Sequence, residues 1–492
     1  MQELFSYQNN ITNLQYIINI LNWELKVIAP KNSKNKLIEV ITEYESKLFR
    51  LKTADEYGKI LYNVINSKQY HTLTDAEKKY IQNLFIEFNE KRKIPIKFYE
   101  EYVKLKEKTN NVWKEAKLKS NFKIFEPYLE KMIKMTKRYY SYIRDDNTNL
   151  YDIMIQHYSK DMNTKKLDIM FNKIKSQIIP LIAEVKSKNY IKYSINCSDQ
   201  ELIECAKIIL DYIGFDFERG SLGIYPHFFT TRINSDDIRI AISNINDPFE
   251  FVTYVLHEGG HGLFEQGINK TLTKYENKII ENIVDLHESQ SKFFENIIGR
   301  NSNFWLPIYD KICNKLHLNI SLDEFVNNLN IINPNISRVK SDELTYCMHI
   351  IIRYEIERDL FNGIIKVDDL PKIWKEKVKD YLGLNEDSFS DGLLQDIHWS
   401  IGYFGYFPSY LLGTIYDGIF LDNIEKEIGD IDDLLNKRKI KSITNYLKNN
   451  IYKYGGAYSA SEVINKLYDS EVNVDCILTY FLKKYQKNKF YK

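Results

Sequence analysis

Residues 254–265 read Tyr254-Val-Leu-His257-Glu258-Gly-Gly-His261-Gly-Leu-Phe264-Glu265, with the pattern His-Glu-x-x-His in the middle. On a helix, residues four positions apart lie on the same face, with Cβ atoms about 5–6 Å apart. His257 and His261 are therefore expected to reach one tetrahedral metal ion together. Glu258 follows His257 directly, so we expect its carboxylate beside the metal, where it can accept a proton from water. The alternative is a pair of ordinary surface or core histidines on an amphipathic helix.

The helix that carries this motif has recognisable ends. Asp247 is a favourable N-cap, Pro248 suits the first helical position, and Glu250 completes a capping box. Gly267 is a plausible residue just beyond the helix, which would then end near Gln266.

The same helix has three glycines in its interior, Gly259, Gly260 and Gly262. Each interior glycine costs about 1 kcal/mol relative to alanine. We therefore expect something to approach the backbone of this helix closely, either another helix or a ligand.

The composition favours one large domain. The chain has 492 residues, but its 10 Pro and 19 Gly form no stretch that resembles a linker. Its charged residues balance to a net charge of +1, so no overall field attracts nucleic acid or a membrane. The N-terminus lacks the pattern of a signal peptide, and no apolar run is long enough to span a bilayer. The five scattered cysteines fit reduced thiols in a cytoplasmic protein.

We expect a single domain over residues 1–492, organised in three parts. A helical scaffold covers 1–215, where apolar residues recur at helical spacing, as in 128–144 and 165–186. The metal and substrate site covers 216–415, which holds seven of the nine histidines. A helical C-terminal part covers 416–492. The predicted fold class is therefore mainly α.

A small sheet is expected immediately before the metal helix. Residues 224–233 and 238–243 are rich in β-branched residues and flank the turn signal Asn234-Ser-Asp-Asp237. Together they predict a hairpin. Its open edge could pair with the main chain of an extended peptide, or the sheet could simply patch a helical fold. Both interpretations remain open.

A third metal ligand is expected on the next helix. A catalytic zinc usually has three protein ligands and one open position for water. Residues 279–298 predict a helix that contains His287-Glu288-Ser-Gln-Ser291. Glu288 is the natural ligand, because a neighbouring helix can pack its carboxylate against the first two. Sequence spacing alone leaves His287 as an alternative ligand, and Glu288 could also be a solvated helix charge.

Four further blocks accompany the metal motif. Residues 237–241 read Asp-Ile-Arg-Ile-Ala, and residues 287–291 read His-Glu-Ser-Gln-Ser. Residues 338–346 read Arg-Val-Lys-Ser-Asp-Glu-Leu-Thr-Tyr, and residues 392–399 read Gly-Leu-Leu-Gln-Asp-Ile-His-Trp. With the metal motif, these blocks resemble in order the signature sequences of the carboxypeptidase Taq family of zinc carboxypeptidases. The resemblance extends over essentially the whole chain.

The resemblance implies a role for individual residues. It implies zinc ligands His257, His261 and Glu288, general base Glu258, and four substrate-binding or oxyanion residues, Arg338, His398, Tyr406 and Arg239. Of these four, Arg338 would bind the terminal carboxylate of the substrate, while His398 and Tyr406 would stabilise the oxyanion. One Zn²⁺ per chain is implied, with Co²⁺ as a possible substitute.

The resemblance also implies a large helical peptidase fold with a deep substrate groove and a small β-sheet beside the zinc site. Members of the family usually form homodimers and remove single C-terminal residues from peptides with broad preference. No nucleic-acid or membrane partner is expected. The chain departs from the family pattern at Ala241, which replaces Thr, and at Lys292, which replaces Arg. It also departs at residues 274–282, which replace a Gly-rich segment.

Two other functions are compatible with the motif. The first is an endopeptidase or oligopeptidase that uses the same zinc helix. Arg338 distinguishes it from a carboxypeptidase, because an exopeptidase needs a buried cation for the free carboxylate. The second is a helical peptide-binding protein without catalysis, against which the full set of ligands and the base argue.

Overall fold

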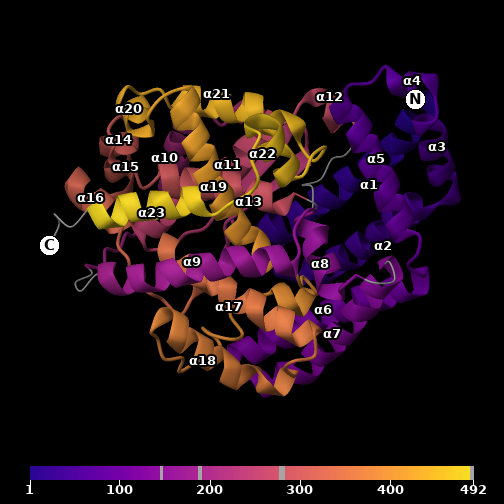
Figure 1. The fold of residues 1–492 in the computed structure, drawn as a ribbon, viewed down its shortest axis with the longest axis horizontal. Coiled ribbons are helices and arrows are strands. Elements are labelled where there is room, and N and C mark those ends of the chain that lie inside the picture. The colour runs from indigo at the N-terminus through magenta and orange to yellow at the C-terminus, as the bar shows by residue number, and fades with distance from the viewer. Residues whose placement is uncertain (145–147, 187–190, 276–282, 488–492) are drawn as a thin grey trace.

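The computed structural model describes residues 1–144, 148–186, 191–275 and 283–487. These residues form a mainly helical molecule with one three-stranded sheet (Figure 1). The fold class predicted from the sequence is therefore confirmed.

The N-terminal helices form the right side of the molecule, and the last two of them extend into its left half (Figure 1). They are α1 (Gln2–Trp23), α2 (Lys34–Thr53), α3 (Asp55–Ile65), α4 (Lys68–His71), α5 (Asp75–Lys91), α6 (Ile96–Leu118), α7 (Phe122–Ile143), α8 (Leu150–Tyr158), α9 (Thr164–Val185) and α10 (Asp199–Ile213). The helices predicted over residues 128–144 and 165–186 correspond to α7 and α9. Local signals fix several ends, as at α10, where Ser198 and Glu201 form a capping box.

The sheet has the strand order β1-β3-β2 and lies directly before the metal helix. Its strands are β1 (Gly220–Ile224), β2 (Phe229–Asn234) and β3 (Asp237–Ile242). β2 and β3 pair antiparallel, which confirms the predicted hairpin, while β1 pairs parallel with β3. The sequence predicted one strand over 224–233, but the chain leaves the sheet between Ile224 and Phe229. Pro226 lies in that break, where a residue without an N–H cannot serve in a ladder.

Three helices form the surroundings of the short helix α13 (Val284–Lys292). Two of them, α11 (Pro248–Gly267) and α19 (Phe407–Glu427), contact it, and the third, α17 (Glu343–Phe361), packs against α19. α13 packs against α11 on one side and α19 on the other, and it continues into the π-helix η4 (Phe293–Ile298). This segment is the predicted helix over 279–298, of which residues 279–282 lie outside the described residues.

Glycines allow the close packing of α13. A Cβ at Gly260 of α11 would lie 2.3 Å from the carbonyl oxygen of Gln290, and a Cβ at Gly413 of α19 would lie 2.8 Å from the nitrogen of Ser289. The expectation that another helix approaches the glycine-containing helix is therefore confirmed. At Gly259, the added Cβ would instead meet the side chains of α10.

The start of α11 has the predicted N-cap at Asp247 and the predicted Pro248, whereas its end differs from the prediction. The side chain of Asp247 accepts hydrogen bonds from the backbone nitrogens of Phe249 and Glu250, as an N-cap does. The helix includes Gly267 instead of ending before it. A Cβ at Gly267 would lie 2.6 Å from the ring of Tyr452, so this glycine serves packing and not a left-handed cap.

Most of the remaining elements complete the upper, left and lower parts of the molecule (Figure 1). They are α12 (Lys270–Thr273), α14 (Ser302–Trp305), α15 (Tyr309–Leu316), α16 (Leu322–Leu329), η5 (Arg338–Lys340), α18 (Leu370–Leu382), η7 (His398–Ile401), α20 (Ile431–Asn436), α21 (Ile440–Asn450), α22 (Ala460–Tyr468) and α23 (Asp475–Lys487). One large hydrophobic cluster includes residues from Leu4 to Tyr485.

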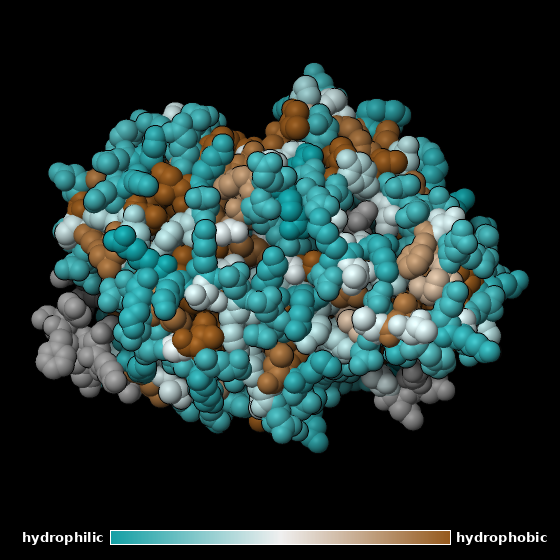
Figure 2. All heavy atoms as spheres, turned by 90° about the horizontal axis from the view of Figure 1, so that it is seen from above, coloured by the Kyte–Doolittle hydropathy of each residue, from teal (hydrophilic) through white to brown (hydrophobic). Residues whose placement is uncertain are grey.

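The face in Figure 2 is mostly hydrophilic, with hydrophobic side chains in scattered patches. Among the described helices, none is long and apolar enough to cross a membrane. All five cysteines are free thiols in this structure.

We expect Gly260→Ala to lower both the free energy of unfolding and metal affinity, because its Cβ would press on the backbone of α13. Overpacking of this kind typically costs about 1–3 kcal/mol. Thermal unfolding and metal titration measure the two effects.

Gly259→Ala is the matched control for this substitution. Its Cβ would meet only the side-chain ends of Leu210 and Ile213, at 2.7 Å, and these ends can move. Equal stability and metal affinity in Gly260→Ala and the wild type would contradict the packing argument.

Candidate metal centre

Three side chains from two packed helices converge at one point. His257 and His261 project from α11, and Glu288 projects from α13. Nε2 of His257 lies 3.9 Å from Oε2 of Glu288, and Nε2 of His261 lies 3.9 Å from Oε1. The three ligand atoms all lie within 4.8 Å of one another, close enough for one ion to contact each of them.

The chemistry of these donors fits a metal ion. Two imidazoles and one carboxylate are a known ligand set of catalytic zinc. Oε2 of Glu288 is buried and has no hydrogen-bond partner among the described residues. A buried polar atom without a partner is costly, and a cation between the three side chains would satisfy it.

Glu295 of η4 orients the first histidine. Its Oε2 lies 2.8 Å from Nδ1 of His257, which leaves Nε2 of that ring directed at Glu288. A carboxylate on the far nitrogen fixes the orientation of a ligand imidazole and raises its basicity. Burial raises the pKa of Glu295, but the charge of Lys292 and the contact with His257 outweigh this and hold the pKa well below its usual value.

Lys292, one of the departures from the family pattern, lies at the same place. Its Nζ donates to Oε2 of Glu295 at 2.9 Å and lies 4.0 Å from the ring centre of Tyr346. The lysine is therefore buried with an anion and an aromatic face as partners, an arrangement that reduces the cost of burying its charge.

Glu258 lies on the sheet side of α11. The hydroxyl of Thr230, on β2, donates to Oε2 of Glu258 at 2.6 Å. Burial raises the pKa of Glu258, while the charge of His257 and the hydrogen bond from Thr230 oppose the rise.

His287 belongs to a different network from the three ligand candidates. Its Nε2 lies 2.9 Å from Oε1 of Glu265, and Glu265 forms a buried ion pair with Arg232 at 3.2 Å. The ring of His287 stacks on that of His261, with centroids 4.4 Å apart. The structure thus brings Glu288, and not His287, to the other two ligand candidates.

Arg338 lies in a buried position where two neighbours fix it. Its Nε donates to Oδ1 of Asp396 at 2.9 Å, and its Nη1 donates to the hydroxyl of Tyr346 at 3.1 Å. The other carboxylate oxygen of Asp396 accepts from Arg353. Asp396 therefore joins the motif at 392–399 to the motif at 338–346.

His398 and Tyr406 lie close to Arg338, together with a residue that the sequence analysis did not select. Nε2 of His398 lies 3.2 Å from the hydroxyl of Tyr410, and the ring of Tyr410 lies 5.0 Å from the guanidinium of Arg338. The ring of Tyr406 has its centre 5.3 Å from both His398 and Tyr410. Burial, followed by the charge of Glu288, raises the pKa of Tyr410 well above its usual value.

Arg239 lies on the other face of the sheet. Successive side chains of a strand alternate between faces, and its neighbour Ile240 packs toward Gly262 of α11. Arg239 instead pairs with Asp237, at 2.6 Å, and lies 5.6 Å from the ring of Trp23. The structure does not bring Arg239 into contact with the ligand candidates.

A cavity of about 720 Å³ lies among the N-terminal helices, and none of the three ligand candidates is among its lining residues. Its lining includes Gln15 and Ile18 of α1 and residues of α2, α6, α7 and α8. Tyr406 and Val284 also line it, and Val284 is one helical turn before Glu288.

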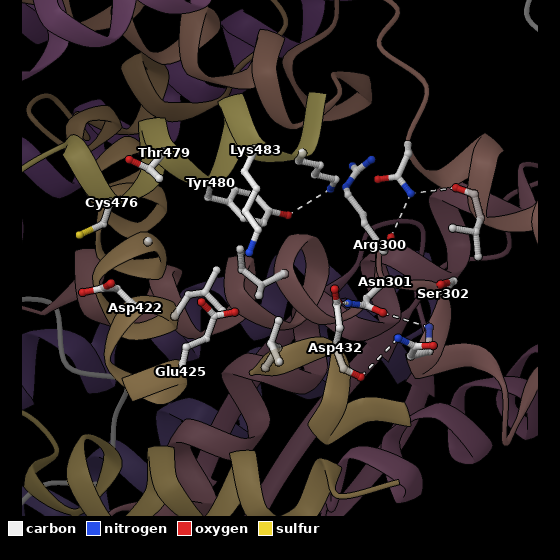
Figure 3. A pocket seen from close by; sticks show the side chains of 18 of the residues that line it. Arg300, Asn301, Ser302, Asp422, Glu425, Asp432, Cys476, Thr479, Tyr480 and Lys483 are labelled. Atoms are coloured by element: carbon white, nitrogen blue, oxygen red, sulfur yellow. Dashed lines mark hydrogen bonds between the residues drawn. The ribbon is translucent and has the colours of Figure 1, made fainter. Parts of the chain in front are cut away.

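A second cavity, of about 820 Å³, lies against η4 and shares no lining residue with the metal centre. Figure 3 shows Arg300 and Asp432 on one side of it, with Asp422 and Glu425 across from them. Arg300 donates to the side chain of Asn296 at 2.9 Å, which connects this cavity to the π-helix.

The sequence analysis did not identify Thr230, Glu295, Asp396 or Tyr410. Glu295 had a usable signal, since it lies seven residues after Glu288 and two helical turns return to the same face. Thr230 had none, because only the three-dimensional pairing of β2 with α11 brings it to Glu258.

We expect Glu295→Gln to weaken metal binding about 10- to 100-fold, because the loss of such a partner of a ligand histidine typically has this effect. The variant keeps the shape of the side chain but removes the charge beside His257. Metal titration of the apoprotein measures the change.

Glu126→Gln is the matched control. It also removes an ion pair with a lysine three residues away, Lys123, but on the surface of α7. Metal affinity equal in both variants would show that Glu295 does not support His257.

Comparison with known proteins identifies the family. The model of the family described as Carboxypeptidase Taq (M32) metallopeptidase matches residues 3–485. Carboxypeptidase 1 of Bacillus subtilis is 34% identical, with 98% of this chain and 97% of that protein covered. Thermostable carboxypeptidase 1 of Pyrococcus furiosus is 27% identical, with 99% of this chain and 98% of that protein covered.

Solved structures agree with these relatives. The crystal structure of BsuCP is 32% identical, with a TM-score of 0.88 and 99% of both chains covered. The structure of Pyrococcus furiosus carboxypeptidase is 26% identical, with a TM-score of 0.91 and 98% of both chains covered. The resemblance predicted from the sequence is confirmed: the chain belongs to the carboxypeptidase Taq (M32) family of metallopeptidases and is a metallocarboxypeptidase.

Proposed function

We propose that this metallocarboxypeptidase uses one zinc ion, held by His257, His261 and Glu288, to release single amino acids from the free C-terminus of peptides with broad preference. Co²⁺ is proposed as a substitute metal. The ligand set supports zinc, because two histidines and a glutamate leave a position open for water. A bound zinc supplies a Lewis acid that lowers the pKa of water toward about 7.

Glu258 is the general base of this proposal. Its carboxylate lies next to the ligand cluster, and the hydrogen bond from Thr230 occupies only one of its two oxygens. The remaining oxygen is available to take a proton from the attacking water and to return it to the leaving amine.

One observation carries the assignment of a C-terminal substrate: the buried guanidinium of Arg338. Its Nε and Nη1 have partners, whereas Nη2 has no hydrogen-bond partner among the described residues. Asp396 pairs with Arg353 as well as with Arg338, so one carboxylate is shared by two guanidinium groups and only partly neutralises Arg338. An incoming carboxylate would accept charge-assisted hydrogen bonds from the guanidinium, which are about twice as strong as neutral ones.

His398 and Tyr406 are proposed to stabilise the oxyanion of the reaction. Burial, together with the charges of Arg338 and Arg353, lowers the pKa of His398 to about 3, against the opposing charge of Asp396. The imidazole is therefore neutral at physiological pH, so one of its ring nitrogens can donate a hydrogen bond without adding a charge. Arg239 stays a proposed substrate-binding residue. Any contact with the substrate would be made on the face of the sheet that points away from α11.

The remaining proposals concern the surroundings of the enzyme. The cavity whose lining includes Tyr406 is proposed as the groove for the peptide upstream of the cleaved bond. The shared hydrophobic cluster supports a single domain over residues 1–492. The family resemblance supports a homodimer, and the free thiols support a cytoplasmic location.

We expect Glu258→Gln to keep the fold and the metal but to lose turnover about 10²- to 10⁴-fold, because the amide cannot accept the proton. Elemental analysis and peptide hydrolysis measure metal and turnover separately. Glu288→Ala is the control, since it should lose both. A Gln variant with a tenth of wild-type turnover would remove Glu258 from the role of base.

We expect a peptide with an amidated end to be cleaved about 30- to 4,000-fold more slowly than the free acid. This range corresponds to about 2–5 kcal/mol for breaking a buried charge pair. Mass spectrometry over time should show free peptides that shorten by one residue at a time.

Arg338→Ala should narrow the difference between free and amidated peptides, mainly by slowing the free ones. Arg338→Lys should restore part of this difference, because lysine keeps the positive charge but lacks the two parallel donors of the guanidinium. Arg358→Ala, which removes a partly exposed ion pair with Asp168, is the matched control and should leave the ratio unchanged. Internal fragments at early times would support an endopeptidase instead.

A further inference from the structure

One face of strand β2 lies directly against the metal helix. The side chain of Thr230 contacts Glu258, and the side chain of Arg232, two residues later, contacts Glu265. Side chains two positions apart in a strand share a face, so both point toward α11. Thr231 lies between them and points to the opposite face.

Thr230 holds one oxygen of Glu258 with a single proton. Its Oγ1 lies 2.6 Å from Oε2 of Glu258 and 3.0 Å from the backbone carbonyl oxygen of the same residue. A hydroxyl has one proton to donate, and the shorter contact to the carboxylate marks a charge-assisted bond. Oε1 of Glu258 has no hydrogen-bond partner among the described residues, so the contact turns one oxygen inward and leaves the other available.

The main chain of Thr230 faces the open edge of the sheet. The sheet has the order β1-β3-β2, so β2 has a partner strand on one side only. The carbonyl of Arg232 accepts a hydrogen bond from Asn19 of α1 at 2.8 Å, which shows that it points away from β3. Backbone groups two positions apart point the same way, so the N–H and C=O of Thr230 also point away from β3.

A second observation gives the same direction. The carbonyl of Ile242 in β3 accepts from Tyr225 on the β1 side, so Ile240, two residues earlier, also directs its backbone toward β1. Thr230 lies opposite Ile240 in the antiparallel pair of β2 and β3. Because the backbone of Ile240 points toward β1, Thr230 and Ile240 form a pair that is not hydrogen-bonded.

The open edge lies beside the proposed substrate groove. Gln15 lines that cavity and donates to the side chain of Asn19, which in turn covers the edge at Arg232. Among the described residues, none donates or accepts a hydrogen bond at the main chain of Thr230 on this open side. An extended peptide in the groove would therefore meet unpaired backbone groups at this residue.

We propose that Thr230 positions both reactants: its hydroxyl orients Glu258, and its main chain pairs with the main chain of the peptide substrate. This inference rests on the proposed function, because it assigns a position to the base and to the substrate of that reaction. One strand residue then sets the distance between the base and the bond to be cleaved, whatever side chains the substrate carries.

The first test compares Thr230→Val with Thr230→Ser. The valine variant keeps the shape but loses the donor, so kcat should fall about 10- to 150-fold, as for a lost hydrogen bond to a charged group. KM, metal content and thermal stability should stay close to wild type. Thr230→Ser should restore most of kcat because it keeps the hydroxyl.

Thr231→Val is the matched control, since it makes the same chemical change one residue away on the opposite face of β2. It should leave kcat unchanged. Wild-type kcat in Thr230→Val, or equal losses in Thr230→Val and Thr230→Ser, would overturn the role of the hydroxyl.

The second test replaces the amide N–H groups of a peptide substrate by ester oxygens, one at a time, upstream of the cleaved bond. If the peptide pairs with the main chain of Thr230, one ester substitution should lower kcat/KM about tenfold. Esters at the two adjacent amides of the peptide should change kcat/KM little. A uniform response along the peptide would overturn the edge pairing. Wild-type release of C-terminal residues from the parent peptide tests the proposed function itself, so the two failures can be distinguished.

Discussion

The close approach of α13 to α11 at Gly260 is the constraint on which the metal centre depends. At this point the backbone of Gln290 occupies the space that any side chain would need. Glu288 lies two residues earlier, so the approach carries its carboxylate to the two histidines of α11. Gly413 of α19 allows the same proximity from the other side. Ligand geometry is thus set by backbone packing, which is rigid because protein interiors are close-packed.

Three buried anions near the centre are each shared between two partners. Glu295 joins His257 to Lys292, and Glu265 joins His287 to Arg232. Asp396 joins two arginines in the same way. A buried ion pair adds little net stability, but the loss of one partner is strongly destabilising. These shared carboxylates therefore act mainly by fixing the orientation of the side chains around the metal centre.

The sequence was informative where chemistry is local. The helix of His257, its cap at Asp247 and the β2–β3 hairpin follow from spacing and turn residues, and the structure has them. The sequence could not reveal β1, whose parallel partner is remote, or the π-helix, whose wide turn has no simple pattern. It also misplaced the end of α11, because Gly267 is required by the distant Tyr452. The domain division and the roles of the site residues stay predictions.

Because η4 is a π-helix, the number of residues between Glu288 and Glu295 determines whether the Glu295 side chain reaches His257. The backbone hydrogen bonds of η4 span five residues instead of four, so each turn holds more of the chain than a turn of the α-helix that precedes it. Removing Phe293 or Phe294 would rotate Glu295 and each later side chain by about 100° around the helix axis. Glu295 would then leave His257, although Glu288 and both histidines would be untouched. Insertions and deletions between Lys292 and Glu295 are therefore as restricted as substitutions of the ligands themselves.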